Sequence, residues 1–434
     1  MSNGNGLPQG RGVEPAAPGA RVTPLELFYD LVFVFAFFTV TELSEEFFTA
    51  SALFKGVLVL ILLWFSWVSF ASLGNIVRAD QGIMPLVGFA TMVPIFLATV
   101  TMPDAFADEP PGLPGDLVFA LCYLAVRGLQ VLAFWYVMRA DRRLRRRWRL
   151  LALPVMVSTA LLVVSAMVPE RVLDGGAETA ARFGLWTAAI AVEYGADALS
   201  PTKRLSVVSV RHLAERYGQI ILIAFGEAIL SLGTGPHLRG GLPLTWSILV
   251  GAALGIAMIA ALWWAYADTL ALAGEQVLRR AQGAARASLV RDAYDYLHLL
   301  MIIGIILFAL GLKRVLGVVA ERPHVSLASA ELYVLSGGVI IYTLAHLGFQ
   351  LRTLRRSDPV HIVGVVLVAA WILPASRMPA FAALALLTVV VVATQSLHQF
   401  YFRHVRREVR TEMLEETREL EAKEQRWRRR RTEE

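Results

Sequence analysis

The sequence has few charged residues and almost no cysteine. Asp, Glu, Lys and Arg together make up 18% of the chain, whereas about 25% is usual in soluble domains. Cys122 is the single cysteine, so the chain forms no internal disulfide and offers no set of cysteines for a metal site. We interpret Cys122 as a small packing residue.

The sequence also lacks the motifs of the common soluble enzymes. It contains no Gly-rich phosphate loop, no G-x-S-x-G nucleophile elbow and no H-E-x-x-H zinc motif. We therefore predict neither a metal nor a cofactor, and the sequence favours a protein that is not an enzyme.

Long apolar runs take the place of these motifs, and hydrophobic residues make up 56% of the 434 residues. A run of about 20 apolar residues crosses a bilayer as a helix, so the lipid bilayer is the first expected partner. We predict an all-α, polytopic transmembrane helix bundle of about twelve spans. The expected spans are Leu25–Thr41, Leu53–Leu73, Ile83–Met102, Leu117–Met138, Leu150–Val168, Ala180–Ala198, Leu213–Gly233, Leu244–Ala267, Tyr294–Leu312, Ala328–Phe349, Val360–Leu373 and Ala380–Tyr401.

Shifts in composition divide the chain into three expected parts. Residues 1–23 are rich in Gly and Pro and lack a secretory signal, so we expect a disordered cytoplasmic leader. Residues 24–401 form the membrane domain. Residues 402–434 are charged nearly throughout, and their thin apolar stripe predicts a cytoplasmic C-terminal helix.

Basic residues gather in alternate loops, which is the pattern of loops that stay in the cytoplasm. The loop after Met138 is rich in arginine, whereas Pro103–Asp116 contains acidic residues and no basic one. We predict that both termini are cytoplasmic and that the protein lies in the bacterial inner membrane. Lys313, Arg314 and Arg322 are an exception to the alternation. The net charge of +6 thus reflects topology, and no nucleic-acid partner is expected.

Two of the expected spans begin with similar motifs. ELFYD, which starts at Glu26, is followed by LVFVFAF, and ERYGQ, which starts at Glu215, is followed by IILIAF. An acidic, an aromatic and a polar residue recur at the same spacing. We predict two halves of six spans, 24–204 and 205–401, related by an axis along the membrane normal as in parallel-repeat transporters.

Charged residues inside the apolar runs are the candidate site. Glu26 and Asp30 share one helix face, where two bare carboxylates need a proton, a cation or an arginine nearby. The alternative is that both lie at the cytoplasmic end of the helix, solvated or capping it. Glu227 lies about 18 Å deeper than Glu215 along its helix. It has a role in transport, or it forms a structural ion pair with Arg127.

Histidines provide the remaining candidates. Asp295 and His298 are three residues apart on one face and would relay protons, or they form a cap under an aromatic belt at the membrane interface. His346 and His398 stand alone on apolar faces, where we expect helix-packing hydrogen bonds, with haem ligation as the lesser alternative.

Three stretches resemble a known family. The run TPLELFYDLVFV from Thr23, the run from His212 to Glu227, and YDYLH, which ends at His298, look like the bacterial low temperature requirement A proteins. The resemblance covers residues 23–400 and implies a membrane fold without naming a reaction, because the family name records a growth phenotype in the cold. The positions it carries over are Glu26, Asp30, His212, Glu215, Arg216, Glu227 and His298.

The leading functional hypothesis is a transporter or channel for a small solute, an ion or protons, because buried carboxylates and histidines are what such a pathway needs. The first alternative is a membrane enzyme or redox protein that acts on a lipid-like substrate. The second is a structural or sensory membrane protein. The sequence allows a homo-oligomer in each case.

Overall fold

The computed structural model describes residues 20–106, 112–139, 148–168, 175–199, 207–235 and 243–403, together with residues 16, 172, 173, 241, 407 and 411. In these residues the regular structure is helical, and the one β contact is an isolated bridge between Ser326 and Pro379. The expected all-α fold is confirmed. Most of the expected leader and of the C-terminal helix lies outside the described residues, so both stay predictions.

Each of the twelve expected spans lies on a helix. The first half of the chain contains α1 (Pro24–Phe47), α2 (Ala50–Ile76), α3 (Met84–Val100), η1 (Asp104–Phe106), α4 (Gly115–Met138), α6 (Trp148–Met167) and α8 (Gly176–Leu199). The second half contains α9 (Val210–Gly233), α10 (Trp246–Ala265), η3 (Tyr266–Leu270), α11 (Ala271–Arg280), α12 (Gly283–Leu289), η4 (Val290–Leu297), α13 (His298–Glu321), α14 (Ser329–Leu354), α15 (Pro359–Ala375) and α16 (Ala380–Tyr401). The segments η3 and η4 are π-helical.

Seven helical stretches among the described residues are long and apolar enough to cross a membrane. They are Pro24–Glu46, Ala50–Ile76, Gly115–Met138, Trp246–Arg280, Gly283–Glu321, Ser329–Leu354 and Ala380–Tyr401. The apolar helices Met84–Val100, Leu151–Met167 and Pro359–Ala375 are shorter. The chain is thus a polytopic helical membrane protein, and the count of twelve spans stays a prediction.

Side-chain caps set where the helices that carry the site begin. Thr23 and Glu26 form a capping box at the start of α1. Ser209 caps the first turn of α9, and Asp358 caps the first turn of α15. These caps place the polar residues of each first turn on a defined face of the helix.

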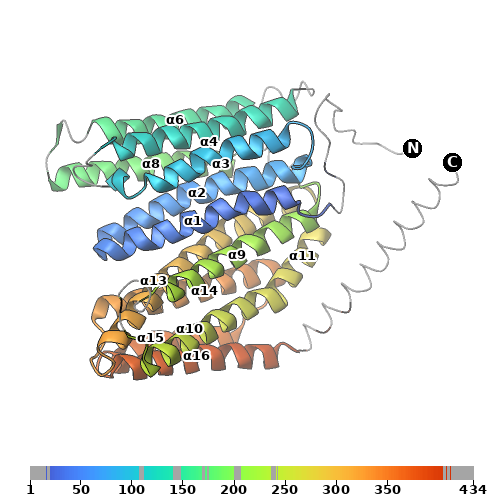
Figure 1. Ribbon diagram of the computed structural model, residues 1–434. Helices are drawn as coiled ribbons and strands as arrows, with labels where there is room; N and C mark the ends of the chain where they lie inside the picture. Colours follow the sequence, from blue (N-terminus) through green and yellow to red (C-terminus); the bar gives the residue numbers. More distant parts are fainter. Residues whose placement is uncertain are drawn as a thin grey trace.

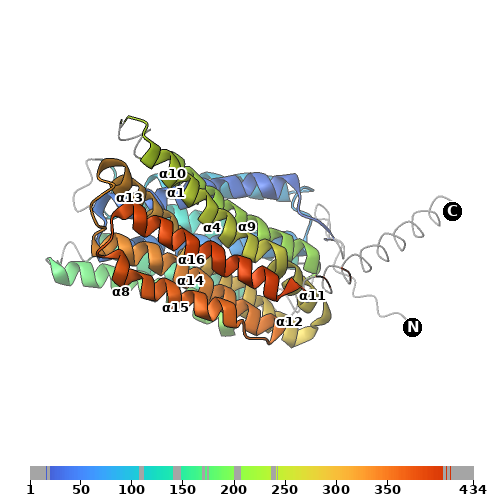
Figure 2. The same cartoon turned by 90° about the horizontal axis from the view of Figure 1, so that it is seen from below.

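The helices pack as two groups, α1 to α8 in the upper part of Figure 1 and α9 to α16 in the lower part. In the first group α1 contacts α2 and α3, then α3 contacts α4, α4 contacts α6, α6 contacts α8, and α8 contacts α2. The second group repeats this order with α9, α10, α13, α14, α15 and α16. Figure 2 shows α14, α15 and α16 of the second group side by side. The groups meet where α1 and α2 pack against α9 and α13.

Glycines bring α13 and α14 into close contact. A Cβ atom at Gly304 would lie 2.5 Å from the backbone nitrogen of Tyr342, and one at Gly338 would lie 2.3 Å from that of Phe308. No larger residue fits at either position, as is common where membrane helices approach closely. The outer faces of the bundle are apolar, with Leu86 66% exposed, which suits side chains that face lipid.

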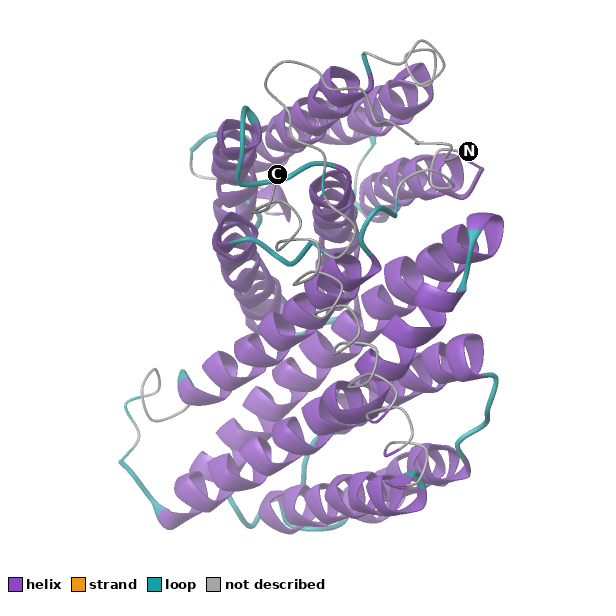
Figure 3. Ribbon diagram, turned by 90° about the vertical axis from the view of Figure 1, so that its right-hand side faces the viewer, coloured by secondary structure: helices purple, strands orange, loops and turns teal. Residues whose placement is uncertain are grey.

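The start of α1 and the end of α16 lie at the same end of the bundle, on the right of Figure 1. We call this the terminal end and the opposite one the distal end. Figure 3 views the molecule from the terminal end and draws only helices and loops among the described residues.

Candidate functional site

A buried ion pair lies on the contact between α1 and α9. Arg216 donates from Nη1 to Asp30 Oδ2 at 2.6 Å and from Nη2 to Asp30 Oδ1 at 2.8 Å. Trp67 of α2 donates to the same carboxylate from Nε1 at 2.9 Å. Neither charged side chain has any exposed surface. This two-point, charge-assisted contact joins the two groups of helices inside the bundle.

Glu26 and His212 form a second contact, one turn nearer the terminal end. His212 Nε2 lies 2.9 Å from Glu26 Oε1. The amide oxygen of Asn75 accepts from the backbone N–H of Val208 at 2.8 Å, so its Nδ2 group faces His212 Nδ1 at 3.2 Å. Because Nδ2 can only donate, Nδ1 accepts and the ring carries its proton on Nε2. In this tautomer His212 donates from Nε2 to Glu26.

This arrangement leaves the cluster with more negative than positive charge. Glu26, Asp30 and Arg216 are all 0% exposed, and with a neutral His212 they supply two carboxylates and one guanidinium. An uncompensated charge is costly in a low-dielectric interior. Binding of one proton or one small cation neutralises the cluster, which is the chemistry that this site can perform.

Four sequence-predicted residues, Glu26, Asp30, His212 and Arg216, come together in this cluster. The prediction of solvated carboxylates is wrong for Glu26 and Asp30, although Glu26 does cap its helix. Glu215 lies outside the cluster, because it is partly exposed and pairs with Arg211 on its own helix at 2.9 Å.

Asp295 and His298 lie close to this cluster but have different partners. The Tyr217 hydroxyl, on the helix that carries Arg216, donates to Asp295 Oδ1. His298 Nδ1 lies 3.0 Å from the carbonyl oxygen of Ala293, and Nε2 lies 2.9 Å from the Tyr266 hydroxyl. A carbonyl oxygen only accepts, so Nδ1 carries the proton and Nε2 accepts from Tyr266. A proton relay through Asp295 and His298 stays a prediction.

The two π-helical segments position this pair of rings. Tyr266 is the first residue of η3, and His298 directly follows the last residue of η4. A π turn changes the direction of the side chains that follow it, and such turns are frequent at functional sites. The hydrogen bond between Tyr266 and His298 therefore joins two irregular helix segments near the buried charges.

Glu227 is fully buried toward the distal end of α9. Ser231 Oγ donates to its Oε1 at 2.5 Å, and its Oε2 has no hydrogen-bond partner among the described residues. The charged side chains of Lys313 and Glu42 and the Thr41 hydroxyl lie near this carboxyl group. A buried carboxyl group with one unmatched oxygen is suited to hold a proton or to bind a cation.

Arg127 pairs with Glu193, so the expected pairing of Arg127 with Glu227 is wrong. Arg127 Nη2 lies 3.0 Å from Glu193 Oε2, and Nη1 donates to Gln130 Oε1 at 2.7 Å. The pair lines a cavity of about 110 Å³ among α2, α4, α6 and α8. The reason is the packing order, because α4 lies within the first group of helices whereas Glu227 belongs to α9.

Two of the three basic residues that are exceptions to the topology pattern have acidic partners. Lys313 contacts Glu42 and Glu45, and Arg314 lies 3.2 Å from Glu331. These pairs hold α13 to α1 and α14. The cytoplasmic location of both termini remains a prediction.

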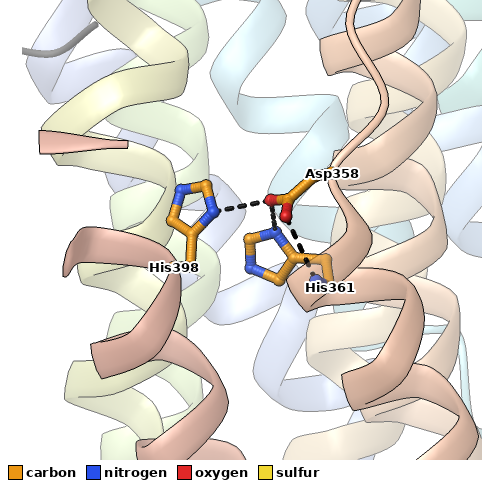
Figure 4. A group of neighbouring side chains, drawn as sticks. All are labelled: Asp358, His361 and His398. Carbon is orange, nitrogen blue, oxygen red and sulfur yellow. Dashed lines mark hydrogen bonds and ion pairs between the residues drawn. The ribbon is translucent and has the colours of Figure 1, made fainter. Parts of the chain in front are cut away.

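A second buried cluster, which the sequence analysis did not find, lies among α14, α15 and α16. Figure 4 shows His361 and His398 around the Asp358 carboxylate, and the His346 ring lies 4.7 Å from the His361 ring. His346 and His398 therefore do not stand alone, contrary to expectation. The available signal was Asp358 three residues before His361 at a helix start, because this spacing puts both on one face.

Asp358 precedes the first residue of α15 and is ionised. Burial on its own raises the pKa of this carboxyl group. The imidazole rings of His361 and His398 outweigh that effect and hold the pKa well below its ordinary range. The two rings thus stabilise the charged form of the Asp358 carboxylate.

Comparison with known proteins places the motifs that carry the buried charges in a known family. Residues 21–396 match the family described as "Bacterial low temperature requirement A protein (LtrA)". The chain is also 26% identical, over 398 residues, to an uncharacterized protein of Rhizobium meliloti (strain 1021), an alignment that covers 88% of this chain and 90% of that protein. The family match includes both motifs with buried charges and most of the helical domain, and it confirms the resemblance seen in the sequence. The chain belongs to the bacterial low temperature requirement A family.

Proposed function

We propose that the protein is a proton-coupled transporter or channel for a small ion or solute, with its pathway along the contact of α1, α9 and α13. The observation that carries the proposal is the distribution of ionisable groups along α9. Arg216 near the terminal end and Glu227 near the distal end are both 0% exposed. Ionisable groups inside a membrane are costly, and they occur where ions or protons pass.

An apolar stretch separates the two ends of this pathway. Phe33 and Phe37 of α1 and Ile220 and Ala224 of α9 are all buried between the charged groups. In the proposed pathway these side chains would close the passage in this conformation. Movement of one group of helices against the other would give each end access in turn, which is how repeat-built transporters work.

Twelve spans in two halves, 24–204 and 205–401, fit this mechanism. The matching order of helix contacts in the two groups supports the repeat, and it makes α1 and α9 equivalent helices that face each other across the boundary. Parallel-repeat transporters bind their substrate at such a boundary. With both termini in the cytoplasm of a bacterium, the terminal end is the cytoplasmic one.

Uptake by vesicles that contain the purified protein tests the proposal. A panel of monovalent and divalent ions is offered with and without a proton gradient, and current is recorded under voltage. We expect at least one ion to move faster than in protein-free vesicles and to respond to the gradient. Absence of uptake and of current across the whole panel contradicts the proposal and favours a membrane enzyme or a structural role.

A further inference from the structure

The buried cluster at the terminal end of α15 and α16 has the ligand atoms of a metal site. Asp358, His361 and His398 each offer one ligand atom, and these atoms all lie within 4.8 Å of one another. The three residues are 0%, 1% and 1% exposed, respectively. Two imidazoles and one carboxylate are ligands that Zn²⁺ and related first-row transition ions accept.

The start of α15 orients the carboxylate. Asp358 Oδ1 accepts from the backbone N–H groups of Val360 at 3.0 Å and of His361 at 3.3 Å. The other oxygen, Oδ2, is thereby turned toward the two rings, where it contacts His361 Nδ1 and lies 2.6 Å from His398 Nδ1. The helix cap therefore fixes the carboxylate without help from an ion.

A hydrogen bond on the far side of the His361 ring defines which nitrogen is free to bind. His361 Nε2 lies 2.9 Å from Gln395 Oε1 and donates its proton there. In a neutral ring the lone pair of Nδ1 then faces a carboxylate oxygen, and two electron-rich atoms in contact need a proton or a cation between them. Metal-binding histidines commonly have this second hydrogen bond from the other ring nitrogen.

His398 lacks the contacts that a purely hydrogen-bonded cluster would give it. Its Nδ1 is close to Asp358 Oδ2 but not aligned for a hydrogen bond, and its Nε2 has no partner among the described residues. His346 Nδ1, also buried, is unmatched as well. An ion beside Asp358 Oδ2 would bind the lone pair of His398 Nδ1, which lies 2.6 Å from that oxygen.

We propose that Asp358, His361 and His398 bind one divalent transition-metal ion of the Zn²⁺ class, with His346 as an additional imidazole beside them. The ion ties α15 to α16 at the terminal end, where both helices lie next to α14. The site is separate from the contact of α1 and α9 and does not depend on the proposed transport.

Metal content of the full-length protein tests this inference. The protein is purified with a tag that contains no histidine, stripped with a chelator, loaded with Zn²⁺ or Co²⁺ and dialysed. We expect about one tightly held ion per chain, a visible Co²⁺ spectrum with nitrogen ligands, and a higher melting temperature with Zn²⁺ than without. Wild-type protein that retains no ion overturns the proposal.

Two variants assign the ion to its site. His398→Gln removes one ligand, and His324→Gln changes an exposed histidine and serves as the control. We expect at least a tenfold loss of Zn²⁺ affinity in the first and none in the second. Equal retention in wild type and His398→Gln overturns the assignment. If His398→Gln does not fold, the Co²⁺ spectrum of the wild type decides, because a spectrum with oxygen ligands alone excludes the histidines.

Discussion

Arg216 of α9 and Asp30 of α1 form an ion pair with two hydrogen bonds, at 2.6 and 2.8 Å, that solvent does not reach. The two residues are 186 positions apart in the chain. The pair therefore joins helices that are far apart in the sequence and belong to different groups. It links the two groups of helices at the cluster of buried charges that includes Glu26.

Removing the arginine should destabilise the fold strongly. Arg216→Leu leaves Asp30 as a buried carboxylate without its cationic partner, which costs roughly 3–5 kcal/mol in the free energy of unfolding. Adding Asp30→Leu should restore part of that loss. Arg211→Leu is the control, because its pair with Glu215 is partly exposed and should cost less than about 1 kcal/mol. Unfolding in detergent gives the free energy of unfolding of the wild type and the three variants. Equal losses for Arg216→Leu and Arg211→Leu contradict the account.

Gly74 of α2 makes room for Glu26. A Cβ atom at this position would lie 2.3 Å from Glu26 Oε1. Gly74→Ala should therefore displace the carboxylate from His212 and cost about 1–3 kcal/mol. At Gly218 an added Cβ meets nothing within 4 Å, so Gly218→Ala should be neutral or stabilise α9 by up to about 1 kcal/mol. Melting temperatures of the two variants in the opposite order would disprove this role of Gly74.

The partner of Arg127 can be tested by comparing two glutamates. Glu193→Gln strands the arginine and should cost roughly 3–5 kcal/mol, part of which the second change Arg127→Leu restores. Glu227→Gln should leave stability within about 1 kcal/mol of wild type, because no arginine depends on it. If Arg127→Leu restores the stability of Glu227→Gln and not that of Glu193→Gln, Glu227 is the partner of Arg127 and this assignment is wrong.

Cysteine labelling tests the orientation in the membrane. In a Cys122→Ala background, Leu113→Cys places a thiol between α3 and α4, where Leu113 is 76% exposed. Ser357→Cys places one in the exposed loop between α14 and α15. In intact cells an impermeant reagent should label the first position and reach the second only after permeabilisation. The reverse pattern would put the terminal end outside the cell.

Much of the fold could be predicted from the sequence, because apolar runs, helix caps and the cost of buried charge are local properties. The runs gave the positions of the helices, and the motif that starts at Glu26 indicated where α1 carries its acids. The partner of each charge depends on packing. Nothing within the helix of Arg127 distinguishes Glu193 from Glu227, and only the contact order of α4, α6 and α8 decides it.

The histidine cluster shows the same limit. Asp358 and His361 are near one another in sequence, but His398 lies on the next helix and His346 on the preceding one. In the sequence, His346 and His398 each seemed to be a single polar residue on an apolar face. The histidines come together because α15 packs against both α14 and α16. The hydrophobic periodicity of the sequence does not predict which helices pack together.

The most direct test of the central claim is proton movement in vesicles that contain the wild-type protein, Glu227→Gln or Glu321→Gln. Glu321 is an exposed carboxylate on α13 and serves as the control. We predict that the wild type and Glu321→Gln move protons with the transported ion. Glu227→Gln should lose at least roughly tenfold in rate at unchanged melting temperature, because the amide keeps its hydrogen bonds but cannot titrate. Equal proton movement in all three proteins, or none above protein-free vesicles, would contradict the account.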